Sequence, residues 1–187
     1  SPDGTWKIVQ KLKEKDEKIH LIRRQGRTGL TSAISEGIGV ATGGVVVWMD
    51  CDLSMPPEKI NDLLQKINDG YDLAVASRYI PGGGMVIIER SQDSIISAVL
   101  SFLMNFVIQK IIDSSFKDYT SGFIAVKKDI LDDIKLRGDY GEYFIDFIYR
   151  AIKKGYKIIE IPYICNARKY GVSKTGTNLV QYIKRGR

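Results

Sequence analysis

Two aspartates that follow an apolar run are the residues of this sequence best suited to hold a metal ion. Asp50 and Asp52 come directly after residues 45–49, which read Val-Val-Val-Trp-Met. If the extended backbone of a strand continues to Asp52, the two carboxylates point to the same side. Like charges at that spacing are unfavourable unless a cation lies between them. The pattern therefore predicts a divalent metal site, and an ordinary surface turn is the alternative.

A second polar pair, Ser77 and Arg78, lies near the end of the next predicted strand, residues 71–79. Ligands of α/β sheets bind at the carboxyl ends of strands. Carboxylates bind a hard cation, and a guanidinium binds phosphate oxygens through paired hydrogen bonds. We therefore expect a metal-bound phosphate ligand at this edge. Ser54 has a structural alternative as the N-cap of the following helix, and we expect Cys51 to pack away from the carboxylates.

The elements that must position these side chains alternate along the chain. Hydrophobic periodicity predicts a strand at 19–24, a helix at 29–43, a strand at 45–49, a helix at 56–70 and a strand at 71–79. Alternation of this kind is typical of an α/β fold with a mostly parallel sheet. The length of 187 residues suggests a single domain.

Charge is distributed unevenly along the sequence. The chain has 28 Lys and Arg against 22 Asp and Glu, a net charge of +6, yet no acidic residue follows Glu160. The cations after that point are Arg168, Lys169, Lys174, Lys184, Arg185 and Arg187. A block of one sign indicates an anionic partner such as phosphate, nucleic acid or an acidic membrane surface, and a solvated basic segment is the alternative. Two separate cysteines predict no disulfide and favour a reducing compartment.

One predicted helix, residues 95–112, is apolar over most of its circumference. Its polar residues recur every four positions, at Ser97, Ser101, Asn105 and Gln109, and form a narrow stripe. We expect contact with a membrane surface or a lipid-lined groove, and a buried core helix is the alternative. Three successive glycines, at 82–84, precede this helix and predict a loop that can move as a lid.

Five sequence blocks together carry a family resemblance. They are SPDGT at the start, MDCDLSMPP at 49–57, ASRY at 76–79, SGFIAVKKDIL at 121–131 and ARKYGVSKTG at 167–176. With these blocks in this order, the sequence resembles the family 2 glycosyltransferases of the dolichyl-phosphate mannose synthase type. The resemblance implies a GT-A fold and one catalytic domain over residues 1–187. It also implies that the first strands of that domain would precede Ser1.

The resemblance assigns roles to matched positions. It implies that Asp50 and Asp52 coordinate Mg²⁺ or Mn²⁺, with Ser54 as the open candidate for a third ligand, and that Asp50, Asp52, Arg78 and Asp118 form the catalytic set. The residues implied to bind the donor or its phosphates are Asp3, Arg78, Arg90, Arg168, Lys169, Ser173 and Lys174. Helix capping by Asp3 and turn capping by Asp118 are structural alternatives. Each cation could equally be a solvated surface charge.

The implied reaction is an inverting transfer of a sugar from a nucleotide-sugar to dolichyl or polyprenyl phosphate. GDP-mannose is the first expectation for the donor and a UDP-sugar such as UDP-glucose the second. The implied partners include an anionic membrane surface, at its cytoplasmic face, and not nucleic acid. Two alternatives remain open: a haloacid-dehalogenase-like phosphatase, which also has Asp-x-Asp after a strand, and a catalytically silent homologue.

Overall fold

The computed structural model describes residues 3–26, 29–86, 92–139 and 141–166. The helices are α1 (Thr5–Lys13), α2 (Leu30–Val40), α3 (Lys59–Asn68), α4 (Gln92–Ile111), α5 (Lys128–Asp133) and α6 (Glu142–Lys153). The strands are β1 (Val45–Trp48), β2 (Leu73–Ser77), β3 (Gly84–Met85), β4 (Ile124–Lys127), β5 (Ile158–Pro162) and β6 (Ile164–Cys165). Strand and helix alternate through α3 and β2, as the periodicity predicts.

The main sheet has the strand order β1-β4-β2-β5 and is mixed. β4 runs antiparallel to both of its neighbours, whereas β2 and β5 are parallel. The prediction of a mostly parallel sheet is therefore wrong. The physical reason is the connection between β2 and β4, which leaves the sheet where β2 ends and returns at the same edge. β4 consequently runs back through the sheet between β1 and β2.

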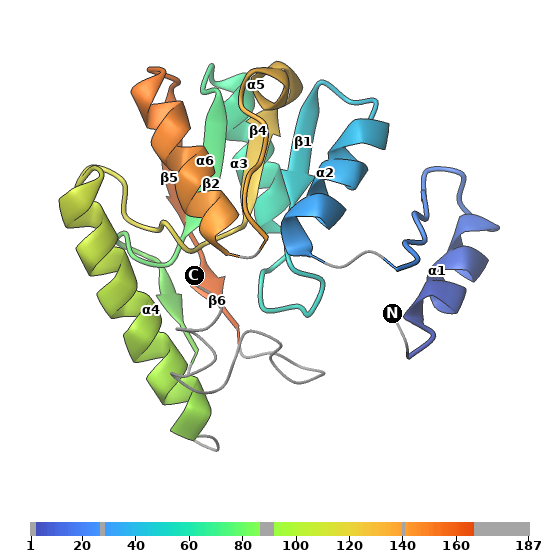
Figure 1. Cartoon of the computed structure of the whole chain (residues 1–187), viewed down its shortest axis with the longest axis horizontal. Coiled ribbons are helices and arrows are strands. Elements are labelled where there is room, and N and C mark those ends of the chain that lie inside the picture. Colours follow the sequence, from blue (N-terminus) through green and yellow to red (C-terminus); the bar gives the residue numbers. More distant parts are fainter. Residues whose placement is uncertain (1–2, 27–28, 87–91, 140, 167–187) are drawn as a thin grey trace.

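Helices cover both faces of this sheet (Figure 1). α3 packs on one face through Leu63 and Ile67, against Phe123 and Ala125. α2, α5 and α6 cover the other face, and the largest part of that core comes from α6. The strands of the sheet centre are buried on both faces, since every residue of β2 is buried. A layered α/β fold is thus confirmed.

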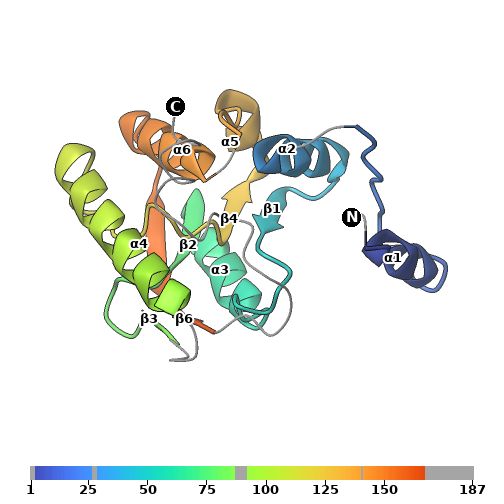
Figure 2. The ribbon, with the colours of Figure 1, turned by 60° about the horizontal axis from the view of Figure 1, so that its bottom comes forward.

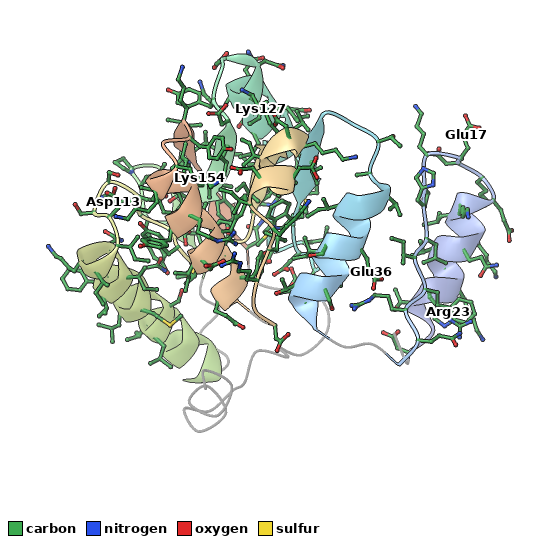
Figure 3. The ribbon with its side chains drawn as sticks, turned by 45° about the horizontal axis from the view of Figure 1, so that its top comes forward. Glu17, Arg23, Glu36, Asp113, Lys127 and Lys154 are labelled. Carbon is green, nitrogen blue, oxygen red and sulfur yellow. The ribbon has the colours of Figure 1, made fainter. Side chains whose placement is uncertain are left out.

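The predicted strand at residues 19–24 does not form. In the described part of the chain this segment has no strand partner, and a strand without a ladder leaves its backbone groups to water. Side chains bind it on two sides instead. The guanidinium of Arg23 lies 3.8 Å from the ring centroid of Trp6 in α1, and Arg24 pairs with Glu36 of α2 at 3.1 Å. Figure 3 shows Arg23 beside α1 and Glu36 on α2.

Two helices lie at the margins of the molecule. α1 has no buried residue and stands apart from the layers (Figure 1). α4 lies along the opposite side and exposes one flank outward (Figure 2). None of the helices within the described ranges combines the length and the hydropathy needed to cross a bilayer.

Candidate functional site

The ends of four strands meet at one edge of the sheet. In the register of the sheet, Ile124 at the start of β4 pairs with Trp48 at the end of β1 and with Val75 near the end of β2. Ser77, the last residue of β2, pairs with Pro162, the last of β5. The loop with Asp50 and Asp52, the residue Arg78, and the turn that holds Asp118 therefore leave the sheet at the same edge. The prediction that the acidic pair and Arg78 follow strands that end at the same edge is confirmed.

The acidic loop is not extended backbone. β1 ends at Trp48, and Leu53 adopts a left-handed conformation with φ of 63°. The expectation that the strand continues to Asp52 is wrong, since residues 51–55 form bends. That the two carboxylates point to the same side stays a prediction. Local bonds shape the loop: the carboxylate of Asp52 accepts from the backbone N–H of Ser54 at 3.0 Å.

Two neighbours of the carboxylates also differ from expectation. Cys51 is exposed, so the prediction that it packs inside is wrong. Ser54 does not cap α3, because the helix begins at Lys59 and its N-cap position, Glu58, makes no side-chain capping bond. Ser54 instead uses its backbone oxygen to accept from the N–H of Asn166 at 2.8 Å. This bond ties the acidic loop to the chain just after β6.

The donor set of the acidic loop suits a cation shared with a phosphate ligand. Asp50 is exposed and Asp52 is half-buried, so both side chains reach the surface at this edge of the sheet. Within the described ranges, no cluster of three or more His, Cys, Asp and Glu side chains is positioned to hold a metal. Mg²⁺ is commonly bound by one or two carboxylates, with substrate phosphates and water as further ligands. Two carboxylates therefore fit such an ion without a complete protein cage.

Arg78 and Asp118 form a buried ion pair. Both carboxylate oxygens of Asp118 accept from the guanidinium, Oδ2 from Nε at 2.9 Å and Oδ1 from Nη2 at 2.8 Å. Oδ2 also accepts from the backbone N–H of Arg78 at 2.9 Å. The Asp118 side chain is fully buried and that of Arg78 is 11% exposed. Burial alone would lower the pKa of Arg78, but the bonds and the charge of Asp118 outweigh it and raise that pKa, so the guanidinium stays charged.

This pairing changes the role expected for Arg78. The fork of Nε and Nη2, which would bind a phosphate through two bonds, is occupied by Asp118. Among the described residues, the recorded partner of Nη1 is the sulfur of Met85 at 3.9 Å, a weak contact. A two-bond grip on phosphate through that fork is therefore not available. Asp118 orients the guanidinium, and contact of Arg78 with a phosphate stays a prediction.

Polar side chains connect this pair to α4. The hydroxyl of Thr120 accepts from Nη2 of Arg78 at 2.7 Å and from the amide of Asn105 at 2.6 Å. Ser101 lies 3.2 Å from the same hydroxyl and accepts from the phenol of Tyr79 at 3.1 Å. The polar stripe predicted on this helix therefore faces inward, toward the site.

Most of the large apolar side chains described on α4, from residue 99 on, face outward, although Ile108 packs against the core. Those at least half exposed are Val99, Phe102, Leu103, Phe106, Val107 and Ile111. A patch of this kind on a helix flank indicates an interaction surface. The core-helix alternative is thus wrong for this face, and α4 has the inverse of the usual amphipathic arrangement.

The glycines before β3 serve close packing. A Cβ atom on Gly83 would lie 2.6 Å from the backbone oxygen of Ser77 and 2.9 Å from the carbonyl carbon of Arg78. The next residue, Gly84, lies in β3, which pairs with β6. Absence of a side chain at residue 83 therefore lets the loop lie against the end of β2. Lid motion remains a prediction.

Asp3 makes local hydrogen bonds just before α1. Its carboxylate accepts from the backbone N–H and the hydroxyl of Thr5, at 3.0 and 2.8 Å, and these bonds lower its pKa. These bonds form a local turn before α1, whose N-cap is Gly4 without a side-chain capping bond, so the N-cap alternative for Asp3 is wrong. A role in donor binding stays a prediction. Five further residues of the predicted site lie outside the described residues: Arg90, Arg168, Lys169, Ser173 and Lys174.

Glu160 is a member of this site that sequence reasoning missed. It lies in β5, and its carboxylate accepts from the backbone N–H groups of Lys117 and Asp118 at 2.8 and 3.0 Å. Burial and the nearby charge of Asp118 raise its pKa, against the effect of a side-chain hydrogen bond with Ser77 and of these two bonds. The available signal was a single carboxylate within the apolar run Ile-Ile-Glu-Ile-Pro. No motif marks that residue.

The fold and the site together define an α/β protein with an acidic loop and a held arginine at one sheet edge. The family model "Glycosyl transferase family 2" matches residues 1–135, and the chain belongs to this family. Over 98% of its length it is 34% identical to the dolichol-phosphate mannosyltransferase of Pyrococcus furiosus, of which it spans 51%. It is also 34% identical, over 96% of its length, to the polyprenol monophosphomannose synthase of Mycolicibacterium smegmatis, of which it spans 69%.

Solved structures of lower identity share the fold. Glucosyl-3-phosphoglycerate synthase from Mycobacterium tuberculosis matches with a TM-score of 0.53 and 12% identity, over 80% of this chain and 49% of that one. One of these structures contains Mn²⁺, uridine diphosphate and phosphoglyceric acid, and another contains Mg²⁺ and uridine diphosphate. The likeness identifies the GT-A fold with a mixed sheet. Membership of the glycosyltransferase family leaves the phosphatase alternative without support.

Proposed function

We propose that this chain is the catalytic part of an inverting glycosyltransferase that moves a sugar, mannose as the first expectation, to dolichyl or polyprenyl phosphate. The observation that carries the proposal is the 34% identity, over nearly the whole chain, to two enzymes named for that chemistry. The chain spans about half of the archaeal relative. The activity of the whole protein is therefore part of the proposal.

The chemistry requires little from a protein base. The acceptor phosphate is an anion near neutral pH and attacks the anomeric carbon directly, while the bond from that carbon to the nucleoside diphosphate breaks. Attack from the face opposite the leaving group inverts the configuration. The main cost is the negative charge that grows on the leaving diphosphate, and fixed positive charge stabilises it. Arg78 supplies such a charge in a fixed position, because Asp118 holds two of its nitrogens.

Asp50 and Asp52 are the proposed ligands of Mg²⁺ or Mn²⁺, with Ser54 as an open third. When bound, such an ion supplies Lewis-acid stabilisation to the diphosphate. The loop presents its carboxylates beside the end of β1, at the edge where Arg78 leaves β2. Oxygen ligands at this edge match the cations found in structures of the fold relative from M. tuberculosis. The donor would be GDP-mannose, with a UDP-sugar as the second candidate.

The outward face of α4 is proposed to approach the membrane that holds the acceptor. A polyprenyl phosphate keeps its hydrocarbon chain in the bilayer, so the site must come to the lipid surface. The exposed apolar residues lie on the same helix as Ser101 and Asn105, whose side chains contact Thr120 in the site. Apolar burial and basic residues near an anionic leaflet both favour such attachment. The proposed location is the cytoplasmic face of a membrane.

An assay on the full-length protein tests the proposal. Radiolabelled sugar nucleotides, each offered with a polyprenyl phosphate and Mg²⁺ or Mn²⁺, should yield a lipid-linked sugar with inverted configuration. Asp52→Asn should abolish this transfer at every metal concentration, while Asp62→Asn, on an exposed turn of α3, should leave it unchanged. Donor binding without turnover would indicate the silent homologue. Full activity of Asp52→Asn across both metal titrations would contradict the metal assignment.

A further inference from the structure

Glu160 occupies an unusual place for a charged residue. It lies in β5 opposite Val75 of β2, with Ile159 and Ile161 on either side. One side of it borders a cavity of about 440 Å³, also lined by Ile80 and Phe116. An apolar residue would fill a strand position of this kind without a desolvation cost. The carboxylate must therefore be explained by what it binds.

Glu160 binds the backbone that leads into the Asp118 turn, and the side chain of Ser77 is a further hydrogen-bond partner. Its two oxygens accept from two consecutive N–H groups, those of Lys117 and Asp118. Two bonds from one carboxylate to adjacent peptide units fix both the position and the direction of that backbone. The next contact in the series is the Asp118 carboxylate, which accepts from Arg78 through its backbone and its guanidinium. A continuous series of bonds therefore runs from β5 to the guanidinium.

We propose that Glu160 is a positioning residue for the transfer reaction: by holding the Lys117 and Asp118 peptide units, it sets where Asp118 aims the guanidinium of Arg78. The inference rests on the proposed function for its link to sugar transfer. Glu160 does not touch substrate. Its effect reaches the reaction through Asp118 and Arg78, which are linked by hydrogen bonds of 3.0 Å or less.

The series gives a specific expectation for substitutions. Gln at residue 160 keeps the shape and retains one carbonyl oxygen, but its amide nitrogen faces an N–H group, so one of the two bonds is lost. Ala removes both. Lost bonds to charged groups have effects of roughly tenfold or more in a rate or binding constant. Disorder of Arg78 should grow in the order wild type, Glu160→Gln, Glu160→Ala.

The test uses the full-length protein and two kinds of measurement. Amide hydrogen exchange reports the bonds at Lys117 and Asp118. The affinity for inorganic pyrophosphate, from titration, and kcat, from steady-state kinetics, report whether the guanidinium of Arg78 is correctly oriented. We expect faster exchange at those amides, pyrophosphate affinity weakened about tenfold, and kcat lowered about tenfold in Glu160→Gln. Glu58→Gln, an exposed change before α3, is the matched control and should change none of these.

The outcomes separate the inference from the proposed function. If the wild type transfers no sugar, the pyrophosphate titration still decides whether Glu160 controls Arg78. Unchanged exchange at the two amides would overturn the inference. Faster exchange with unchanged pyrophosphate affinity and unchanged kcat would also overturn it, because Glu160 would then stabilise the backbone of Lys117 and Asp118 without positioning Arg78. If Glu160→Ala does not fold, Glu160→Gln alone carries the same decision.

Discussion

Breaking the buried pair of Arg78 and Asp118 should cost more stability than removing the whole pair. Asp118 is fully buried and accepts three bonds from Arg78, whose side chain is 11% exposed. Asp118→Asn removes the charge and leaves the guanidinium buried without compensation. Loss of one partner of such a pair typically costs about 3–5 kcal/mol. Domains of this kind have unfolding free energies on the order of 5–15 kcal/mol, so the loss would be a large fraction.

A double-mutant cycle measures the interaction. Urea unfolding, followed by circular dichroism, gives the free energy of unfolding for Asp118→Asn, for Arg78→Met and for the double variant. In the double variant no charge is left buried, so its loss should be smaller than the sum of the two single losses by about 2 kcal/mol or more. Asp132→Asn is the control, because its pair with Lys135 is mostly exposed and should contribute little.

Two results would refute this reasoning. Additive single losses, equal to the loss of the double variant within about 0.5 kcal/mol, would show that the two side chains do not interact in solution. An Asp118→Asn protein as stable as the wild type would show that Arg78 finds another partner or reaches water. The second result would also remove the basis for a fixed guanidinium in the proposed site.

Three further predictions follow from neighbouring contacts. Gly83→Ala should lower the melting temperature and weaken donor binding, because its Cβ would lie 2.6 Å from a backbone oxygen at the end of β2. The control is Gly84→Ala, whose Cβ would lie 3.4 Å from a side-chain methyl and which should change the melting temperature little. The raised pKa of Glu160 means that the folded state favours its protonated form, so the wild type should lose stability relative to Glu160→Gln as the pH rises from its ordinary pKa of 4.5; a constant difference in urea unfolding across that range would contradict it. Phe102→Ser with Phe106→Ser should abolish co-sedimentation with anionic liposomes while circular dichroism stays unchanged, and retained sedimentation would exclude α4 as the attachment surface.

Local patterns predicted those elements whose burial follows a simple period. α2 and α3 lie within the predicted ranges: 29–43 was predicted as a run of small residues that ends at glycine, and the apolar residues of 56–70 form one helical stripe. β2 is apolar up to Ser77 and is buried throughout. The strand at 19–24 failed because β-structure needs a partner, and side-chain pattern alone does not supply one. The prediction of a mostly parallel sheet failed at β4 for a related reason. Its antiparallel course depends on where a connection from residue 78 to residue 123 returns, and no local signal encodes that.

For the site, too, the sequence identifies residues but not the residues that they bind. The sequence places Asp50, Asp52 and Arg78 correctly at one edge, because each follows a recognisable strand. Asp118, six residues before β4, was named only through the family resemblance. It cannot show that Arg78 is already bound, since its partner lies 40 positions away and is brought near by the register of β2 and β4. The two hydrogen bonds that we expected Arg78 to donate to a phosphate are instead donated to Asp118.

Glu160 and α4 illustrate a common physical cause for what the sequence conceals. A charged residue in an apolar strand and a polar stripe on an apolar helix both look like minor interruptions of a core pattern. In the structure, Glu160 binds the backbone before Asp118, and Ser101 and Asn105 contact Thr120 beside it. Both features direct polar groups toward one buried ion pair from opposite elements. Burying polar groups has a desolvation cost unless each finds a partner, so their convergence on Arg78 and Asp118 identifies this pair as the centre that the surrounding polar residues organise.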